Sequence, residues 1–170
     1  MAIVKAVNVR FINAEPNAGK MKHSVMAYFR FQRRFHLVCT EFDLKDVFAV
    51  KFEQDMQIKE AIECEIKISL ADLKRERKKP KHRKMTGITH FYFAVPSTIL
   101  RETVNFCEEF YPQYGVIHIG NGLFDPVCSI AKSAKRLPNT IGTSYLRSVL
   151  SRMSCEIITL RGEKLRRVEK

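Results

Sequence analysis

Residues 36–73 read HLVCTEFDLKDVFAVKFEQDMQIKEAIECEIKISLADL, and three apolar runs with strand-like spacing fill most of this stretch. The runs cover His36 to Phe42, Asp46 to Phe52 and Lys59 to Lys67, where apolar side chains recur at about every second position. A tight polar connection, Asp43-Leu44-Lys45, joins the first two runs. Because successive strands with short connections favour antiparallel pairing, this stretch predicts a three-stranded meander.

The segments around the meander predict alternating helices and strands. Ser69 is a good N-cap and Asp72 puts a negative charge in the first turn, so we expect a helix to about Lys78, ended by Pro80. The other expected elements are a short strand over 2–12, helices over 21–34 and 97–110, strands over 89–95, 115–119 and 126–130, and a long helix from about 141. This order predicts one α/β (α+β) domain over residues 1–170, a central mixed sheet flanked by helices, with a basic C-terminal tail from about 160.

The composition favours an intracellular protein that binds polyanions. Thirty Lys and Arg residues against 18 Asp and Glu give a formal net charge of +12, an excess that attracts nucleic acids. The five Cys residues lack the spacing of a zinc knuckle, which favours reduced thiols in a reducing, cytoplasmic setting. No apolar run is long enough for a transmembrane helix, so no membrane partner is expected.

The end of the third predicted strand carries the residues best suited to chemistry. Glu65 and Lys67 are two positions apart and should therefore project from the same face of the strand. If the second and third strands pair as a hairpin, Asp46 lies beside them at its open end. Two carboxylates suit Mg²⁺, the backbone carbonyl of Ile66 could complete the coordination, and a neighbouring Lys can orient water or steady charge on a phosphate. An exposed Glu-x-Lys pair on an ordinary strand is the alternative interpretation.

These residues resemble the core of a known nuclease superfamily. Asp46 with Glu65-Ile66-Lys67 is similar to the motif of the PD-(D/E)XK nucleases. The runs at 64–73, 78–83 and 91–96 are similar to the MmcB-like DNA-repair branch, and the likeness extends from about Glu41 to Ile130. The resemblance implies a restriction-endonuclease-like fold and metal-dependent phosphodiester hydrolysis. It also implies that Asp46 and Glu65 are metal ligands and that Lys67 is the catalytic lysine.

Two positions depart from the superfamily pattern. Many members carry an acidic residue on the helix before the meander, whereas residues 21–34 contain no Asp or Glu. Glu41, on the first predicted strand, is the nearest substitute and is included as a candidate catalytic residue. The arginine that the family places just before the strand aspartate is Lys45 here, which keeps the charge but not the bidentate geometry.

A strongly basic segment begins seven residues after Lys67. Residues 74–84 (KRERKKPKHRK) contain eight Lys or Arg residues and one acid, Glu76. Such runs are often solvated helix faces, but the position beside the candidate site favours contacts with a nucleic-acid backbone. The predicted nucleic-acid-binding residues are Lys74, Arg75, Arg77, Lys78, Lys79, Lys81, His82, Arg83 and Lys84.

Together these patterns predict a DNA nuclease that depends on Mg²⁺ or Mn²⁺ and acts in DNA repair or recombination, as an endonuclease rather than an exonuclease. The expected partner is duplex or branched DNA. Because many enzymes of the implied fold cut both strands as dimers, a homodimer is also considered. The alternative is a nuclease-fold accessory protein that binds DNA or RNA without cutting it.

Overall fold

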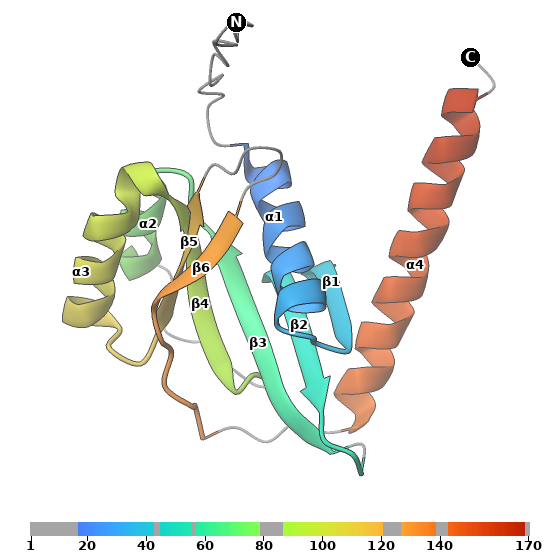
Figure 1. The fold of residues 1–170 in the computed structure, drawn as a ribbon, viewed down its shortest axis with the longest axis horizontal. Coiled ribbons are helices and arrows are strands. Elements are labelled where there is room, and N and C mark those ends of the chain that lie inside the picture. Colours follow the sequence, from blue (N-terminus) through green and yellow to red (C-terminus); the bar gives the residue numbers. More distant parts are fainter. Residues whose placement is uncertain are drawn as a thin grey trace, which may run out of the picture.

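The structure is a computed structural model, and it describes residues 17–42, 45–55, 57–78, 87–120, 127–138 and 143–168. Six strands form one sheet in the order β1-β2-β3-β4-β5-β6, and helices cover both of its faces (Figure 1). This is an α+β fold, so the prediction of a central mixed sheet flanked by helices is confirmed. The expected strand over 2–12 lies outside the described residues.

The first three strands form the predicted antiparallel meander. They are β1 (Leu37–Phe42), β2 (Lys45–Phe52) and β3 (Ile58–Ile66), and β2 pairs with both neighbours. Residues 47–50 on β2 are completely buried because the strand is covered on both faces. That burial explains why four successive apolar residues occur here in place of an alternation.

The sheet continues with two parallel strands and a final antiparallel one. β4 (His90–Pro96) pairs in parallel with β3, and β5 (Gly115–Gly120) pairs in parallel with β4. β6 (Val127–Lys132) pairs antiparallel with β5. The carboxyl ends of β3, β4 and β5 therefore meet at one edge of the sheet.

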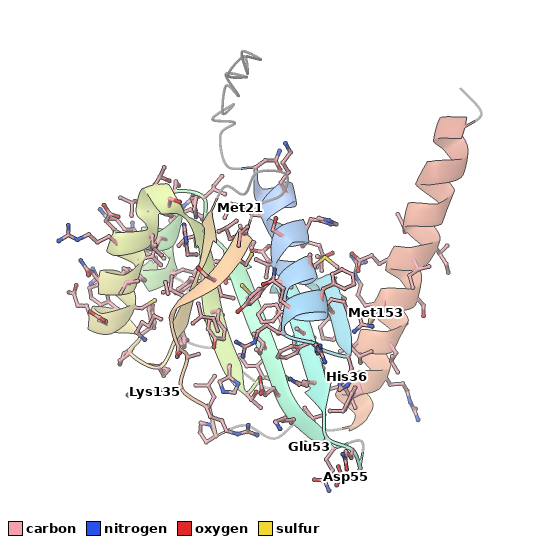
Figure 2. The ribbon with its side chains drawn as sticks, viewed as in Figure 1. Met21, His36, Glu53, Asp55, Lys135 and Met153 are labelled. Atoms are coloured by element: carbon pink, nitrogen blue, oxygen red, sulfur yellow. The ribbon has the colours of Figure 1, made fainter. Side chains whose placement is uncertain are left out.

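Two apolar clusters lie on opposite faces of this sheet. On one face α1 (Ala18–Ala27), continued by a π-helical turn over Tyr28–Gln32, contributes buried side chains that include Met21 and Val25. On the other face α2 (Leu70–Arg75), α3 (Leu100–Phe110) and α4 (Thr143–Val168) contribute Leu73, Phe106 and Val149. Figure 2 shows the side chains that fill both layers.

The helix ends follow from capping residues. Asn17 caps α1, since its side chain accepts from the backbone of Gly19 and Lys20, so this helix begins three residues earlier than predicted. Ser69 caps α2 as predicted by accepting from the backbone of Asp72 at 3.2 Å. The predicted helix over 69–78 ends in a 3₁₀ turn, Glu76–Lys78.

The helix α4 runs beside the edge strand β1, and its C-terminal part extends beyond the sheet (Figure 1). The guanidinium of Arg152 donates to the Thr40 carbonyl at 3.0 Å, and the Thr40 hydroxyl donates to Glu156 at 2.6 Å. These contacts cover an edge that would otherwise present unpaired backbone groups. The α4 backbone is helical as far as Val168, through the expected basic tail. In the described part of the chain, no helix combines the length and the apolar character needed to cross a membrane.

Candidate active site

The open end of the β2–β3 hairpin places Asp46 beside the end of β3. Val47 pairs with Cys64, so Asp46, the second residue of β2, is level with the last two residues of β3. One carboxylate oxygen of Asp46 accepts a hydrogen bond from the backbone N–H of Ile66 at 2.8 Å. The predicted neighbours thus lie side by side, but the contact shown for Ile66 uses its amide and not its carbonyl.

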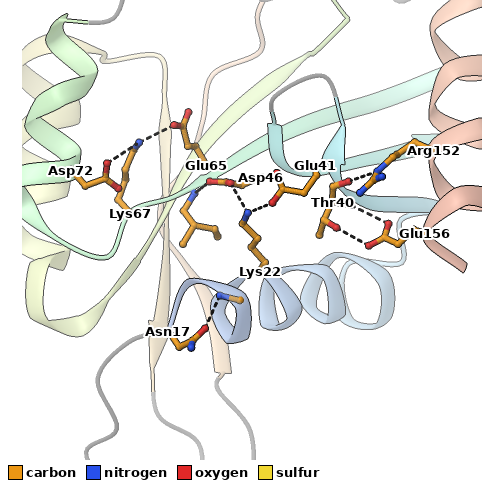
Figure 3. Close-up of polar contacts among 12 residues, drawn as sticks. Asn17, Lys22, Thr40, Glu41, Asp46, Glu65, Lys67, Asp72, Arg152 and Glu156 are labelled. Atoms are coloured by element: carbon orange, nitrogen blue, oxygen red, sulfur yellow. Dashed lines mark hydrogen bonds and ion pairs between the residues drawn. The ribbon is translucent and has the colours of Figure 1, made fainter. Parts of the chain in front are cut away.

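Lys67 is held between two carboxylates. Its ammonium group donates to Glu65 at 2.8 Å and to Glu76 at 2.7 Å. A carboxylate oxygen of Asp72 lies 3.9 Å away, and Figure 3 shows Lys67 between Glu65 and Asp72. The Lys67 side chain is only 3% exposed, and its two acceptors are 9% exposed. The Lys67 backbone N–H donates to Ala94 on β4 at 3.0 Å, which fixes where the side chain begins. Desolvating a charge is costly, and its two hydrogen-bonded acceptors offset that cost.

Glu76 is the site residue that sequence reasoning missed. It is the only acid in the basic run over 74–84, and it lies in the 3₁₀ turn after α2. It follows Asp72 by four residues, so both side chains point from the same side of the helical segment. The spacing of Asp72 and Glu76, three and seven residues after the Ser69 cap and shortly after Lys67, is the signal that could have identified Glu76.

A second lysine-centred group lies on the α1 side of Asp46. Lys22 of α1 contacts the other Asp46 carboxylate oxygen at 2.9 Å and also forms an ion pair with Glu41. Partial burial lowers the pKa of Lys22, but hydrogen bonds and Coulomb attraction from Glu41 and Asp46 outweigh it, so the pKa is raised above its usual value. The helix before the meander, in which residues 21–34 contain no Asp or Glu, therefore contributes a cation to this group.

Glu41 reaches this group because its backbone is unusual. Its φ angle is +51°, a left-handed conformation that costs a non-glycine residue about 1–3 kcal/mol. The β1–β2 register runs from Thr40 opposite Val47 to Phe42 opposite Lys45 and skips Glu41. Past this irregularity, Phe42 packs on the α4 face of the sheet while Glu41 pairs with Lys22 on the α1 face.

Lys45 lies apart from the candidate site. It is buried, and its ammonium group sits 5.8 Å from the ring centre of Phe42 and 5.7 Å from that of Tyr145. Cation–π attraction to these two rings offsets part of the cost of burial. The Lys45 side chain therefore packs beside aromatic rings in this structure.

The strand ends that form the candidate site carry more acidic than basic side chains. Two ammonium groups and five carboxylates leave three net negative charges there, in a chain whose formal charge is +12. The members of this strand-end cluster are Lys22, Glu41, Asp46, Glu65, Lys67, Asp72 and Glu76. Carboxylate oxygens on adjoining strands suit Mg²⁺, which often takes only one or two of them. Within the described ranges, no group of three or more His, Cys, Asp or Glu side chains is arranged to hold a metal ion.

A polar pair lies at the same edge on the next strands. The hydroxyl of Ser97, directly after β4, is 2.8 Å from a ring nitrogen of His118 on β5. Ile66, Ala94 and Ile117 are in register across β3, β4 and β5, so this pair lies near the carboxyl ends of the parallel strands, as Lys67 does. Ser97 follows the end of β4, and His118 lies within β5. Ligands of open α/β sheets commonly bind beyond these ends.

The described Lys and Arg side chains of the basic segment are exposed to solvent beside the cluster. Lys74, Arg75 and Lys78 are exposed, and the Arg77 guanidinium lies over the Phe110 ring at 4.1 Å. Arg75 also approaches Asp72 at 3.7 Å. The remaining predicted binding residues, Lys79, Lys81, His82, Arg83 and Lys84, lie outside the described residues.

We compared the chain with known proteins by sequence and by structure. No protein-family model, no curated protein and no solved structure matches this chain.

Proposed function

We propose that this chain is a DNA nuclease that hydrolyses phosphodiester bonds with the help of Mg²⁺ or Mn²⁺. The observation that carries the proposal is the buried Lys67, fixed between Glu65 and Glu76 at a strand end that also presents Asp46. Apolar side chains in place of all three charged residues would be no less stabilising at such a buried position, so a charge network held there favours a functional role over a structural one.

Each residue has a distinct task in this proposal. Asp46 and Glu65, with the Ile66 carbonyl, would hold the cation. When bound, the cation would polarise the phosphate and lower the pKa of a bound water. An ammonium group has three N–H donors, and Glu65 and Glu76 accept two from Lys67. We assign the third to the attacking water or to a phosphate oxygen on which charge develops.

The wider surface supports a nucleic-acid substrate. The exposed Lys74, Arg75 and Lys78 follow the cluster directly and can contact backbone phosphates without reading sequence. We propose duplex or branched DNA as the partner, endonucleolytic cutting, a role in repair or recombination, and a homodimer as the form that would cut both strands. The five cysteines are free thiols, which fits a reducing cytoplasmic setting.

A substrate and metal screen tests the proposal. Purified protein is incubated with branched, duplex and single-stranded DNA in Mg²⁺, Mn²⁺ or EDTA, beside Lys67→Gln and the control Lys59→Gln. Lys59 also pairs with a carboxylate, Glu53, but that pair is half exposed and lies at the opposite end of the hairpin (Figure 2). We expect metal-dependent cutting that Lys67→Gln reduces by about 10²- to 10³-fold and Lys59→Gln leaves unchanged. Equal cutting by both variants would remove Lys67 from the mechanism.

The second candidate function is binding of DNA or RNA without cleavage. It is favoured by Lys22, whose ammonium group already forms ion pairs with both Asp46 and Glu41. A protein of this kind would bind DNA in a salt-dependent manner and give no product in any metal of the screen. Neutralising Lys74, Arg75 and Lys78 would then weaken binding, whereas Asp46→Asn would not.

A further inference from the structure

A basic surface lies at the end of α1 away from the strand-end cluster. Residues 17–40 contain five Lys or Arg residues and no Asp or Glu. Three of the five are exposed arginines in or directly after the π-helical turn that continues α1. Figure 2 marks the two ends of this segment, with Met21 near its beginning and His36 just past its end. We call the following residues the α1-end surface: Arg30, Phe31, Arg33 and Arg34.

Phe31 presents an aromatic ring to solvent within this surface. It is 75% exposed, whereas Tyr28 and Phe29 of the same π-helical turn are buried. The Arg33 N–H closes the turn by donating to the Tyr28 carbonyl at 2.9 Å. Single exposed apolar side chains are common on proteins, but this one lies among cations, with Arg30 before it and Arg33 two residues after it. Aromatic rings beside basic side chains are what proteins use to bind single-stranded nucleic acids.

The three arginines of the surface can receive an anion. The Arg30 guanidinium donates to the Phe35 carbonyl at 3.1 Å, a contact that uses one of its five N–H donors. Among the described residues, no carboxylate lies within ion-pair distance of any of the three arginines. Arg75 in the basic segment, by contrast, approaches Asp72 at 3.7 Å. An excess of positive charge of this kind attracts polyanions.

Neighbouring elements add further cations to the border of this surface. The Lys51 ammonium group of β2 donates to the Arg33 carbonyl at 3.2 Å. Burial raises the pKa of the Tyr92 hydroxyl, while the hydrogen bond from the Ala134 N–H and the nearby charge of Arg33 oppose that rise. The exposed Lys135 directly follows Ala134. Basic side chains from α1, β2 and the segment after β6 therefore lie around the same end of the sheet.

The length of β2 relates this surface to the candidate active site. Lys51, which contacts Arg33, lies five residues after Asp46 on the strand, and five residues of a strand span about 16 Å. Successive phosphates of one DNA strand are about 3.4 Å apart along the helix axis, so about five nucleotides cover this length. A strand bound at the α1-end surface can therefore also reach the strand ends.

An anionic membrane is another polyanion that a basic helix can meet. A helix that lies in a membrane interface buries a broad apolar face in the lipid. On α1 and its π-helical turn, Phe31 is the one exposed large hydrophobic side chain among the described residues. A single ring is suited to stacking on a base and gives little apolar area for insertion into lipid. The surface therefore favours a nucleic acid.

We propose that the α1-end surface is a second nucleic-acid-binding surface, which takes single-stranded DNA. A base stacks on the Phe31 ring, and the guanidinium groups of Arg30, Arg33 and Arg34 contact the phosphates on either side. The choice of DNA over RNA rests on the proposed nuclease function, whereas the binding itself requires no cleavage. The surface is separate from the basic segment over 74–84, which follows the candidate active site in the chain.

Fluorescence anisotropy with a labelled oligothymidylate tests the stacking role of Phe31. The titrations contain EDTA, so that no strand is cut. The matched control for Phe31→Ala is Ile158→Ala, which removes a 70% exposed apolar side chain from α4. We expect Phe31→Ala to raise the Kd about 5- to 150-fold, as the loss of one stacked base does, and Ile158→Ala to leave it unchanged. Phe31→Tyr should keep the affinity and Phe31→Leu should not, because stacking needs a ring.

Two further comparisons separate the phosphate contacts from the stacking. Replacing Arg33 and Arg34 with Gln should lower the salt slope of oligothymidylate binding by about 0.7 per lost phosphate contact, whereas the exposed Arg101→Gln on α3 should not change it. On a blunt duplex of the same length, Phe31→Ala should bind as the wild type does, because paired bases offer no free face to the ring.

Several results would overturn the proposal. They are wild-type protein that does not bind the oligothymidylate, Phe31→Ala or Phe31→Leu with wild-type affinity, and tighter binding of an oligouridylate. Sedimentation with phosphatidylserine vesicles that depends on Phe31 would replace DNA by a membrane. The nuclease proposal is judged separately, by cutting in Mg²⁺ or Mn²⁺. Weaker oligothymidylate binding by Phe31→Ala in a protein that cuts no DNA retains this surface and removes the nuclease. Cutting by a protein in which Phe31→Ala changes no affinity does the reverse.

Discussion

Replacing Lys67 with methionine should destabilise the fold far more than the loss of an ordinary ion pair. The substitution keeps the length of the apolar stem but removes the charge between Glu65 and Glu76, each at hydrogen-bond distance. All three side chains are at most 9% exposed, so the two carboxylates would remain desolvated and would lose the cation that they share. Breaking a buried pair in this way typically costs about 3–5 kcal/mol.

Urea unfolding followed by circular dichroism measures this loss. With an m-value of about 2 kcal/mol/M, the midpoint should fall by about 1.5–2.5 M. The matched control is Lys59→Met, which breaks a 3.1 Å pair with Glu53 whose side chains are about half exposed. That variant should lose less than about 1 kcal/mol, since water screens exposed pairs.

A double-mutant cycle shows whether the loss comes from the pair itself. Glu76→Gln removes one of the two buried negative charges that Lys67 contacts, so the double variant should be more stable than the sum of the single effects by about 1–3 kcal/mol. A loss below about 1 kcal/mol in Lys67→Met, or single effects that simply add, would refute the view that a buried charge network holds this strand end.

Three further predictions concern the thiols, the sheet and the binding surface. Burial raises the pKa of the Cys39 thiol to about 12 and that of Cys128 to about 11, so at pH 8 these thiols stay protonated. Ellman's reagent should then label only the exposed Cys155 rapidly in the native protein, and a second fast thiol would contradict the burial. Gly115→Ala would place a Cβ 2.3 Å from the Tyr92 ring, so we expect the free energy of unfolding to fall by about 1–3 kcal/mol. An unchanged midpoint of thermal unfolding would count against this close packing. Neutralising the exposed Lys74, Arg75 and Lys78 together should weaken DNA binding, measured by fluorescence anisotropy. The slope of log K against log salt concentration should fall in magnitude by about 0.9 per lost phosphate contact. An unchanged slope would show that these residues do not contact DNA.

The sheet could be predicted from the sequence because its signals are local. Strand-like spacing in three consecutive runs, short connections and the Ser69 cap together specify the meander and the helix after it. The pairing of β2 with β3 then places Asp46 beside Ile66, as expected from the hairpin alone.

The partners of the candidate site residues depend on long-range packing, which no local pattern reports. Lys22 contacts Asp46 because the apolar side chains of α1 pack on the sheet and thereby fix the position of the helix. Glu41 points toward Lys22 through a left-handed backbone conformation that glutamate does not favour. Glu76 was assigned to a basic, solvated segment by its neighbours in sequence, yet its own side chain is buried against Lys67.

The most direct test of a nuclease site at this strand end is the cleavage rate of Asp46→Asn. Asparagine keeps the shape of the side chain and an oxygen that can accept from Ile66, but it loses the charge that a metal ion requires. The control is Glu53→Gln, an exposed carboxylate at the opposite end of the hairpin (Figure 2). We predict that Asp46→Asn cuts DNA at least about 100-fold more slowly in Mg²⁺ while its affinity for DNA and its unfolding midpoint stay close to those of the control. Cutting by Asp46→Asn at the rate of Glu53→Gln would contradict the account.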